Sequence, residues 1–251
     1  MTDASASTDR PLAGRIALVL GASRGIGRAA GAALAAAGAH VIAAARTQGG
    51  LEELDDDVRA AGGDAVTLVP LDLTNGDELD ILGAELHRRW GKLDILVFAA
   101  GTLGASTPVS HMDVKVWDRT VAVNLTAAYR AIRSLDVLLR QSDAGRAVFL
   151  TSGVASSTRP FFGPYAATKA GLEALVRTYA AEVAHTPVRC AIMNPGPVRT
   201  RMRAEAFPGE DPMTLPAPEE VAPLIVELCR PDREPATETV QFYDWAGRSR
   251  A

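Results

Sequence analysis

The chain has 251 residues, of which 47% are hydrophobic and 22% charged, and its formal net charge is −4. This apolar content excludes a disordered chain, because there is ample surface to bury against the entropy of folding. The acidic balance argues against a nucleic-acid-binding protein, and apolar runs such as residues 16–20 and 95–100 are far shorter than the ~20 residues that span a bilayer.

The chain begins with residues 1–13, a polar segment that we expect to be a flexible leader. This segment has neither a basic start nor an apolar core, so it is not a secretory signal. Cys190 and Cys229 lie far apart in apolar stretches, which argues against a disulfide framework. A cytoplasmic location fits both observations.

Beyond residue 13, short runs of β-branched residues or leucine alternate with segments of helical period. The runs predict strands at residues 16–20, 40–45, 65–71, 93–98, 147–151, 188–194 and 238–242. The segments between them predict helices at residues 26–37, 50–61, 76–90, 113–140, 164–185 and 218–229. Thr74 and Ser110 each stand three residues before an acid, Asp77 and Asp113, as in the capping boxes that begin helices.

The predicted strands are apolar on both faces, which is typical of a parallel sheet covered by helices on both sides. Strands that alternate with helices through right-handed crossovers form a doubly wound sheet. No internal repeat or linker interrupts this pattern. We therefore predict an α/β protein with one domain at 14–251, a Rossmann-like doubly wound parallel sheet of about seven strands with helices on both faces.

A glycine-rich turn follows the first predicted strand directly and opens the first predicted helix. Gly21 permits the tight turn, Gly25 lets the backbone approach a phosphate, and Gly27 lets the helix pack on the strand. Glycines also occur in ordinary strand-to-helix connections, but the first such turn of an alternating sheet is where a dinucleotide binds. The predicted contacts of this turn are Gly21, Ser23, Arg24, Gly25, Ile26 and Gly27.

The end of the second predicted strand indicates which dinucleotide is bound. A site for NAD carries an acid there, which accepts from the ribose 2′-hydroxyl group. Here Ala45 is followed by Arg46, and Arg46 and Arg24 could both reach a 2′-phosphate. The alternative is that Arg46 is a solvated charge, but we favour NADP(H) over NAD(H).

Tyr165 and Lys169 stand four residues apart near the start of a predicted helix, so both project from one face. An ammonium group beside a phenol is expected to lower the pKa of the phenol, which suits an acid/base catalyst. Ser152 follows the fifth predicted strand, where its hydroxyl group could hold a substrate oxygen. Each residue alone is common on an ordinary helix or turn, and the prediction depends on their joint position after a dinucleotide turn.

With these motifs, nearly the whole chain from about residue 15 resembles the short-chain dehydrogenase/reductase family. The glycine turn at 21–27 matches the family's cofactor motif, and Tyr165 with Lys169 matches its active-site motif. Ser152 stands thirteen residues before the tyrosine, as in the family. The resemblance adds Asn124 as the fourth catalytic residue, which holds a proton-relay water. It also implies cofactor contacts at Asp72, Leu73, Ala100, Gly101, Pro195, Gly196, Val198 and Thr200.

Within the family, the chain looks most like a poorly characterised bacterial subgroup. The resemblance implies an NADP(H)-dependent oxidoreductase that transfers hydride between the nicotinamide and a carbonyl or secondary alcohol, with Tyr165 as acid/base. A non-catalytic dinucleotide sensor and a 3-oxoacyl-carrier-protein reductase are the alternatives. The second is disfavoured because Asp143 and Thr186 stand where basic docking residues are expected.

The resemblance also implies a homotetramer or homodimer, in which the helices predicted at 113–140 and 164–185 pair with their symmetry mates. These helices carry more apolar residues than one face needs for packing on the sheet. The residues concerned are Val121, Leu125, Ile132, Leu135, Leu172, Leu175, Val176 and Tyr179.

Three further features bear on the site. Residues 200–218 form a substrate-loop segment, with a proline-rich part from residue 207 that we expect to be a substrate lid or a plain surface loop. An apolar or aromatic substrate is expected from Phe161, Phe162, Met202, Phe207 and Met213. The four histidines have no metal-ligand spacing, so we predict no metal.

Two positions depart from the family's pattern. Leu20 stands where a threonine is usual, and Phe98-Ala99 replaces a pair of asparagines. A polar pair exchanged for apolar residues as a unit can be nearly neutral, since no buried polar group is left unpaired. The end of the chain also differs, because Tyr243-Asp244-Trp245 stands where glycines are usual.

Overall fold

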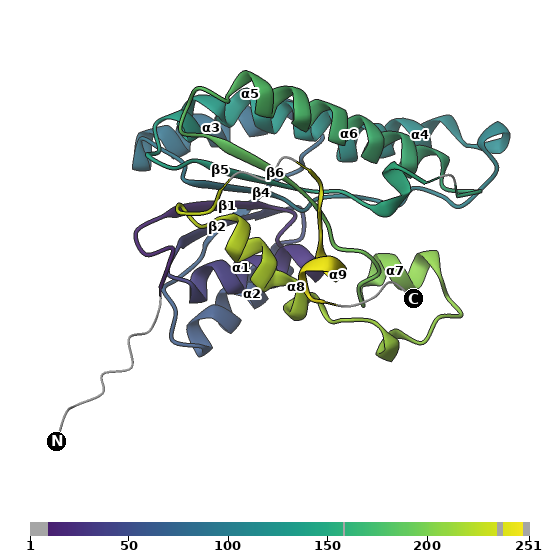
Figure 1. Ribbon diagram of the computed structural model, residues 1–251, viewed down its shortest axis with the longest axis horizontal. Helices are drawn as coiled ribbons and strands as arrows, with labels where there is room; N and C mark the ends of the chain where they lie inside the picture. Colours follow the sequence, from purple (N-terminus) through teal and green to yellow (C-terminus); the bar gives the residue numbers. More distant parts are fainter. Residues whose placement is uncertain (1–9, 158, 235–237, 248–251) are drawn as a thin grey trace.

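Seven parallel strands form one sheet in the order β3-β2-β1-β4-β5-β6-β7 (Figure 1). The computed structural model describes residues 10–157, 159–234 and 238–247. The strand order reverses after β1, as in a doubly wound sheet, which confirms the predicted fold class. The strands are β1 (Ile16–Leu20), β2 (His40–Ala45), β3 (Thr67–Pro70), β4 (Ile95–Phe98), β5 (Arg146–Leu150), β6 (Arg189–Asn194) and β7 (Val240–Gln241).

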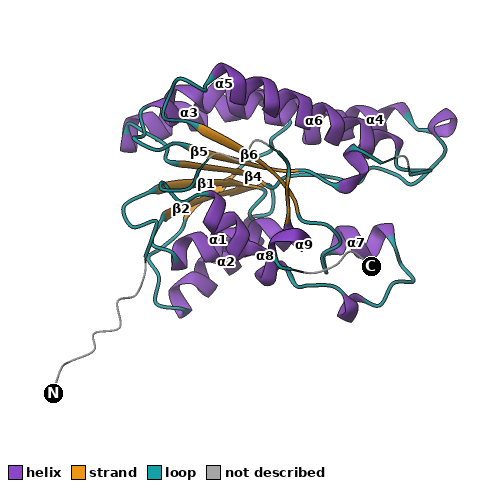
Figure 2. Ribbon diagram, viewed as in Figure 1, coloured by secondary structure: helices purple, strands orange, loops and turns teal. Residues whose placement is uncertain are grey.

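Helices cover both faces of the sheet (Figure 2). One face carries α1 (Gly25–Ala36), α2 (Gln48–Ala60) and α8 (Pro218–Leu228). The other carries α3 (Gly76–Trp90), α4 (Val114–Val121), α5 (Ala127–Arg140) and α6 (Gly163–Glu182). Among the shorter pieces are α7 (Arg201–Ala206), α9 (Phe242–Trp245), and the 3₁₀ turns η1 (Val109–His111), η3 (Gly153–Ala155) and η4 (Pro212–Thr214).

The core consists of two apolar layers, one on each face of the sheet. Along β1, Ala17 and Val19 point into the layer between the sheet and helices α1 and α8. Leu18 and Leu20 point into the layer between the sheet and helices α3 and α5. All four side chains are fully buried. Because both faces of each strand are covered, the strands are apolar without alternation, and this is why their positions could be predicted.

Several element boundaries differ from the prediction. β3 begins at Thr67 instead of residue 65, and the strand predicted at 238–242 is two residues long and runs into α9. Residues 1–9 of the predicted leader lie outside the described residues. Its last part is not a leader, since Leu12 is fully buried and its backbone N–H donates to the Ala37 carbonyl at 2.9 Å.

Both predicted capping boxes are wrong. Helix α3 starts after Asn75, whose side chain donates to Glu78 instead of capping the helix. Ser110 lies within the 3₁₀ turn η1, and Asp113 itself caps α4 by accepting from the backbone N–H groups of residues 115 and 116. A carboxylate directly before a helix fills the role that the prediction gave to a hydroxyl group.

The helix predicted at 113–140 is continuous in direction but not in hydrogen bonding. A π-helical turn, η2 (Ala122–Thr126), separates α4 from α5. Asn124 lies in the middle of this turn and is fully buried. Single π turns inside α-helices are frequent at functional sites, because the wider turn re-aims one side chain.

Strand β3 forms one edge of the sheet, with β2 as its neighbour. The backbone N–H of Leu71 donates to the Ala45 carbonyl at 3.0 Å, so residue 71 faces the sheet. Since backbone groups alternate along a strand, the preceding residue, Pro70, faces outward. The edge therefore has a proline where a free N–H group would otherwise stand.

Candidate active site

The predicted site residues gather at the carboxyl ends of the strands, around a hollow of about 260 Å³. Loops after β1, β2, β3, β4, β5 and β6 contribute to its walls. Of the predicted cofactor contacts, Gly196 and Val198 do not line it, although they lie on a turn whose neighbours do. The others do: Gly21, Ser23, Arg24, Gly25, Ile26, Gly27, Arg46, Asp72, Leu73, Ala100, Gly101, Tyr165, Lys169, Pro195 and Thr200.

The glycine turn is shaped by two close approaches of backbone to backbone. Gly21 has φ +94°, and a Cβ there would lie 2.7 Å from the Ala100 nitrogen. A Cβ on Gly27 would overlap the carbonyl of Gly21. Gly25 has φ +56° and begins α1, whose first turn has no acid and whose N-terminus has no side-chain cap. The N–H groups of that turn are therefore available to an anion in the hollow.

Two cations stand at the rim of the hollow. Arg24 and Arg46 are both exposed and line it, and within the described residues neither guanidinium has a hydrogen-bond or ion-pair partner. Unpaired guanidinium groups are suited to bidentate binding of a phosphate. These two side chains follow β1 and β2, which are adjacent strands.

Asp72 also lines the hollow, at the end of β3, and it is held as a carboxylate. Burial acts to raise its pKa, but hydrogen bonds from Thr74 and the charge of Arg119 outweigh burial and lower the pKa. Its backbone N–H donates to Glu78 at 2.9 Å, which ties this wall of the hollow to α3. The carboxylate is therefore a fixed acceptor.

Asn124 connects three elements behind the hollow. Its Oδ1 accepts from the backbone N–H of Thr102 at 2.8 Å, and its Nδ2 donates to the Thr102 carbonyl at 2.9 Å and to Thr168 Oγ1 at 3.1 Å. It thereby binds the loop after β4 to α6, two residues of which line the hollow. The π turn supplies the orientation that lets one amide make all three bonds.

Tyr165 is half-buried at the start of α6, and its hydroxyl environment differs from the prediction. Burial raises the pKa of the phenol, and a hydrogen bond with Ser152 lowers it by less. The expected lowering by Lys169 is wrong, because the Lys169 ammonium lies 5.8 Å from the ring centre and burial of the phenol is the larger effect. Tyr165 is thus kept as a neutral O–H donor.

Lys169 is only 3% exposed, and its Nζ donates to the Leu150 carbonyl at 2.8 Å. Burial lowers the pKa of its ammonium group to about 8, and the negative charge of Glu173 opposes that effect. Lysine with such a pKa changes charge just above neutrality. The pair of Tyr165 and Lys169 faces the hollow, whereas Ser152 is only partly exposed and stands beside it.

Sequence reasoning missed the role of the chain's end in shaping the site. The Tyr243 hydroxyl donates to the Pro197 carbonyl at 2.7 Å, and its ring lies where a Cβ on Gly196 would be. Asn194 donates to Gln241 at 2.7 Å and accepts from the backbone N–H of Gly196 at 3.0 Å. The unusual C-terminal sequence therefore braces the turn at 195–197, and no local signal marks this long-range contact.

Of the side chains predicted to form an apolar substrate pocket, Met202 alone lines the hollow. Phe161 and Met213 are largely exposed. Phe162 and Phe207 do not line the hollow and stack on each other, with ring centres 5.9 Å apart. This stack connects the loop before α6 to the segment after α7.

Packing explains the apolar residues at the two positions that depart from the family's pattern. Leu20 and Phe98 are register partners on β1 and β4, and both are fully buried in one apolar layer. Phe98 also stacks on Phe149, with ring centres 6.0 Å apart. The side chains that stand at these two positions therefore pack into the same core.

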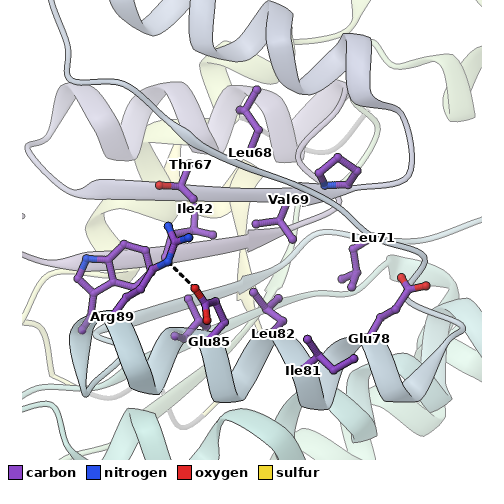
Figure 3. A pocket seen from close by; sticks show the side chains of 13 residues that line it. Ile42, Thr67, Leu68, Val69, Leu71, Glu78, Ile81, Leu82, Glu85 and Arg89 are labelled. Carbon is purple, nitrogen blue, oxygen red and sulfur yellow. Dashed lines mark hydrogen bonds and ion pairs between the residues drawn. The ribbon is translucent and has the colours of Figure 1, made fainter.

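A larger hollow, of about 400 Å³, lies at the outer edge of the sheet between β3 and α3 (Figure 3). Its walls are mainly apolar, with Val69 and Leu82 facing each other, and an ion pair of Arg89 with Glu85 stands at one end. None of the predicted site residues lines it. The smaller hollow is the one lined by Tyr165, Lys169 and the glycine turn, so we take it as the candidate active site.

The comparison with known families agrees with this geometry. The short chain dehydrogenase family matches residues 15–211. The chain belongs to this family. An uncharacterized oxidoreductase of Escherichia coli K12, YciK, is 36% identical to this short-chain dehydrogenase over 220 residues, which are 87% of each chain.

Solved structures extend the likeness to the whole domain. A short chain dehydrogenase of Shigella flexneri 2a, complexed with NADP, is 33% identical and has a TM-score of 0.89 over 93% of this chain and 99% of its own. A second, from Escherichia coli CFT073 and complexed with NADPH, is 34% identical, with a TM-score of 0.89 over 93% of this chain and 98% of its own. Both relatives thus hold a phosphorylated dinucleotide.

Two features are absent from residues 10–157, 159–234 and 238–247 of this short-chain dehydrogenase. No helix there combines the length and apolar character needed to cross a bilayer. In the same ranges, no three His, Cys, Asp or Glu side chains are grouped closely enough to hold a metal ion.

Proposed function

We propose that this protein is an NADP(H)-dependent oxidoreductase that interconverts a carbonyl compound and a secondary alcohol. The observation that carries the proposal is that Tyr165, Lys169 and the glycine turn line one hollow, with Ser152 hydrogen-bonded to the tyrosine. A phenol, an ammonium and a phosphate-binding helix start are the groups that reductive hydride chemistry requires in one place.

The residues around the hollow fit NADP(H). The uncapped start of α1 would hold the pyrophosphate, and Arg24 and Arg46 would hold the 2′-phosphate. The family resemblance assigns the adenine to Asp72 and the nicotinamide amide to the turn at 195–200. When bound, the nicotinamide supplies the hydride that adds to the carbonyl carbon.

The chain's own residues manage the proton and the substrate oxygen. The Ser152 hydroxyl group holds the oxygen, and Tyr165 donates its proton to it as negative charge develops. Lys169, as an ammonium below about pH 8, stabilises the phenolate that is left. Asn124 supports the path by which Tyr165 is reprotonated. The raised pKa of Tyr165 keeps the proton on its hydroxyl group, as donation to a carbonyl oxygen requires.

The proposal is tested by Tyr165→Phe, which removes only the hydroxyl group. NADPH oxidation with a panel of aromatic and aliphatic carbonyl compounds should fall at least tenfold in kcat, because general acid catalysis is worth about 10²–10⁴-fold. NADPH affinity should be nearly unchanged, since the glycine turn and both arginines remain. A variant that keeps more than about a tenth of the wild-type kcat contradicts the mechanism.

The panel also separates the alternatives. A dinucleotide sensor would bind NADPH but turn over no carbonyl compound. A carrier-protein reductase would prefer an acyl group on a carrier protein to the free ketone. We expect the preferred substrate to be a free apolar or aromatic carbonyl compound, because the apolar side chain of Met202 lines the hollow.

We also propose that the protein is a homodimer or homotetramer. Most of the apolar residues expected to be left over for association are buried within the single chain: Ile132, Leu135, Leu172, Val176 and Tyr179. Tyr129 and Val137 of α5, which are 52% and 62% exposed, are the apolar side chains that support association. Light scattering at micromolar concentration should give at least a dimer mass, and a monomer mass removes the proposal.

A further inference from the structure

The end of β5 and the face of α6 are joined at three successive residues. Ser152 contacts Tyr165, the Leu150 carbonyl accepts from Lys169 at 2.8 Å, and Thr151 Oγ1 donates to Glu173 Oε1 at 2.8 Å. The three α6 residues are spaced by four, so they lie on one face of the helix. Two of these contacts belong to the proposed acid/base site, and the third involves a carboxylate that the mechanism does not use.

The carboxylate of Glu173 is built into the fold. The residue is 9% exposed, and its Oε2 accepts from Arg177 Nη2 at 2.6 Å. Arg177 Nη2 also donates to Thr239 Oγ1 at 3.2 Å, just before β7. A buried carboxylate is tolerated when hydrogen bonds satisfy it. Both carboxylate oxygens of Glu173 have a partner, since Thr151 donates to Oε1 and Arg177 donates to Oε2.

The surroundings of Lys169 contain one negative charge. On α6 it faces Tyr165, whose ring centre is 5.8 Å away, and Glu173. β5 presents the neutral Leu150 carbonyl, and η2 presents the neutral amide of Asn124 near Gly101. Within the described residues, Glu173 is the charge that acts on the ammonium group, and Arg177 offsets part of it.

We propose that Glu173 is a positioning residue, which sets the register of α6 on the end of β5 and supplies the negative charge that keeps Lys169 an ammonium group. The inference builds on the proposed function, because it concerns the same site. It gives a role to an acid that the helical pattern alone marks as a solvated surface residue. Through Arg177, the same carboxylate connects the catalytic helix to the C-terminal segment.

The direct test follows the titration of Lys169 without any substrate. The chain has three lysines, at positions 92, 115 and 169, so ¹³C-lysine NMR gives three resolvable signals, which Lys169→Arg assigns. In Glu173→Gln the pKa of Lys169 should fall by about one pH unit, since an opposite charge nearby is lost. In Arg177→Gln it should rise, because the charge of Glu173 is no longer offset.

Opposite shifts of the Lys169 pKa in these two variants indicate a charge effect. Loosening of the helix would move the pKa in the same direction in both variants. Glu182→Gln, at the exposed end of α6, is the matched control and should shift nothing. Thr151→Val removes the hydrogen bond to Glu173 but not the charge of Glu173, so it should leave the pKa of Lys169 unchanged and lower kcat at every pH. It also keeps the proposal testable if Glu173→Gln does not fold.

Activity gives a second readout. With the Lys169 pKa moved from about 8 to about 7, Glu173→Gln should lose about fivefold in kcat at pH 8 and little at pH 6, with KM nearly constant. An unchanged Lys169 pKa, or shifts of the same sign in both charge variants, overturns the proposal. If the NMR shifts occur but Tyr165→Phe keeps wild-type turnover, the proposed function fails instead, and the role of Glu173 in holding Lys169 charged stands.

Discussion

Lys169→Met should change the pH dependence of folding stability by a predictable amount. The buried ammonium group of Lys169 has its pKa lowered from 10.5 to about 8 in the folded chain, because burial disfavours its charge. In the unfolded chain it keeps the ordinary value. Between about pH 8 and 10.5 the unfolded chain therefore binds more protons than the folded one, and stability rises with pH.

The magnitude follows from the difference of about 2.5 pH units between 10.5 and about 8. Each unit corresponds to about 1.4 kcal/mol, so charging this residue destabilises the fold by about 3 kcal/mol below pH 8. The residue is only 3% exposed, so solvent screening reduces this little. Replacing it with methionine removes the titration while keeping similar volume.

The assay is urea unfolding of the ligand-free wild type and of Lys169→Met, at intervals from pH 7 to pH 11. The free energy of unfolding of the wild type, minus that of the variant, should increase by about 3 kcal/mol over this range. Other titrating groups are common to both proteins and cancel. Lys115→Met, at an exposed lysine on α4, is the control. A difference that stays constant with pH refutes the reasoning.

Two further predictions concern the cofactor turn. Arg46→Ala should weaken NADPH binding about 10- to 150-fold and NADH binding little, and Ala45→Asp should shift preference towards NADH, as measured by fluorescence titration of both cofactors. Equal losses for the two cofactors would show that Arg46 is only a surface charge. Gly21→Ala should lower both the Tm and NADPH affinity, since φ is +94° and a Cβ would lie 2.7 Å from the Ala100 nitrogen. Gly209→Ala, where a Cβ meets no atom within 4 Å, should leave both unchanged, and equal effects of the two would contradict the steric argument.

The parts of the fold that could be predicted are those whose residues are buried on two sides. The strand at 16–20 reads as an unbroken apolar run because Leu18 and Val19 face different core layers. The glycine turn was predictable for a related reason, since a side chain on Gly21 or Gly27 would overlap neighbouring backbone atoms. Such requirements act on single residues and leave a local pattern.

The parts that could not be predicted depend on contacts between distant residues. The π turn at Asn124 has no period of its own in sequence, because one wide turn within a helix leaves the apolar spacing almost unchanged. Tyr243 reaches Pro197 from 46 residues away. In sequence, Glu173 has the spacing of an ordinary acid on a helix. Its burial follows from the fold, which places Thr151 against its carboxylate.

The proline at the outer side of β3 affects how readily copies of the chain aggregate through this edge. An uncovered edge strand presents a template on which another strand can add, and repeated addition leads to fibrous aggregates. At Pro70 an incoming strand finds a ring instead of a hydrogen-bond donor, and β3 is only four residues long. Newly made or concentrated chains are thus protected against pairing of their β3 edge strands. Replacing Pro70 by threonine would restore the missing hydrogen-bond donor.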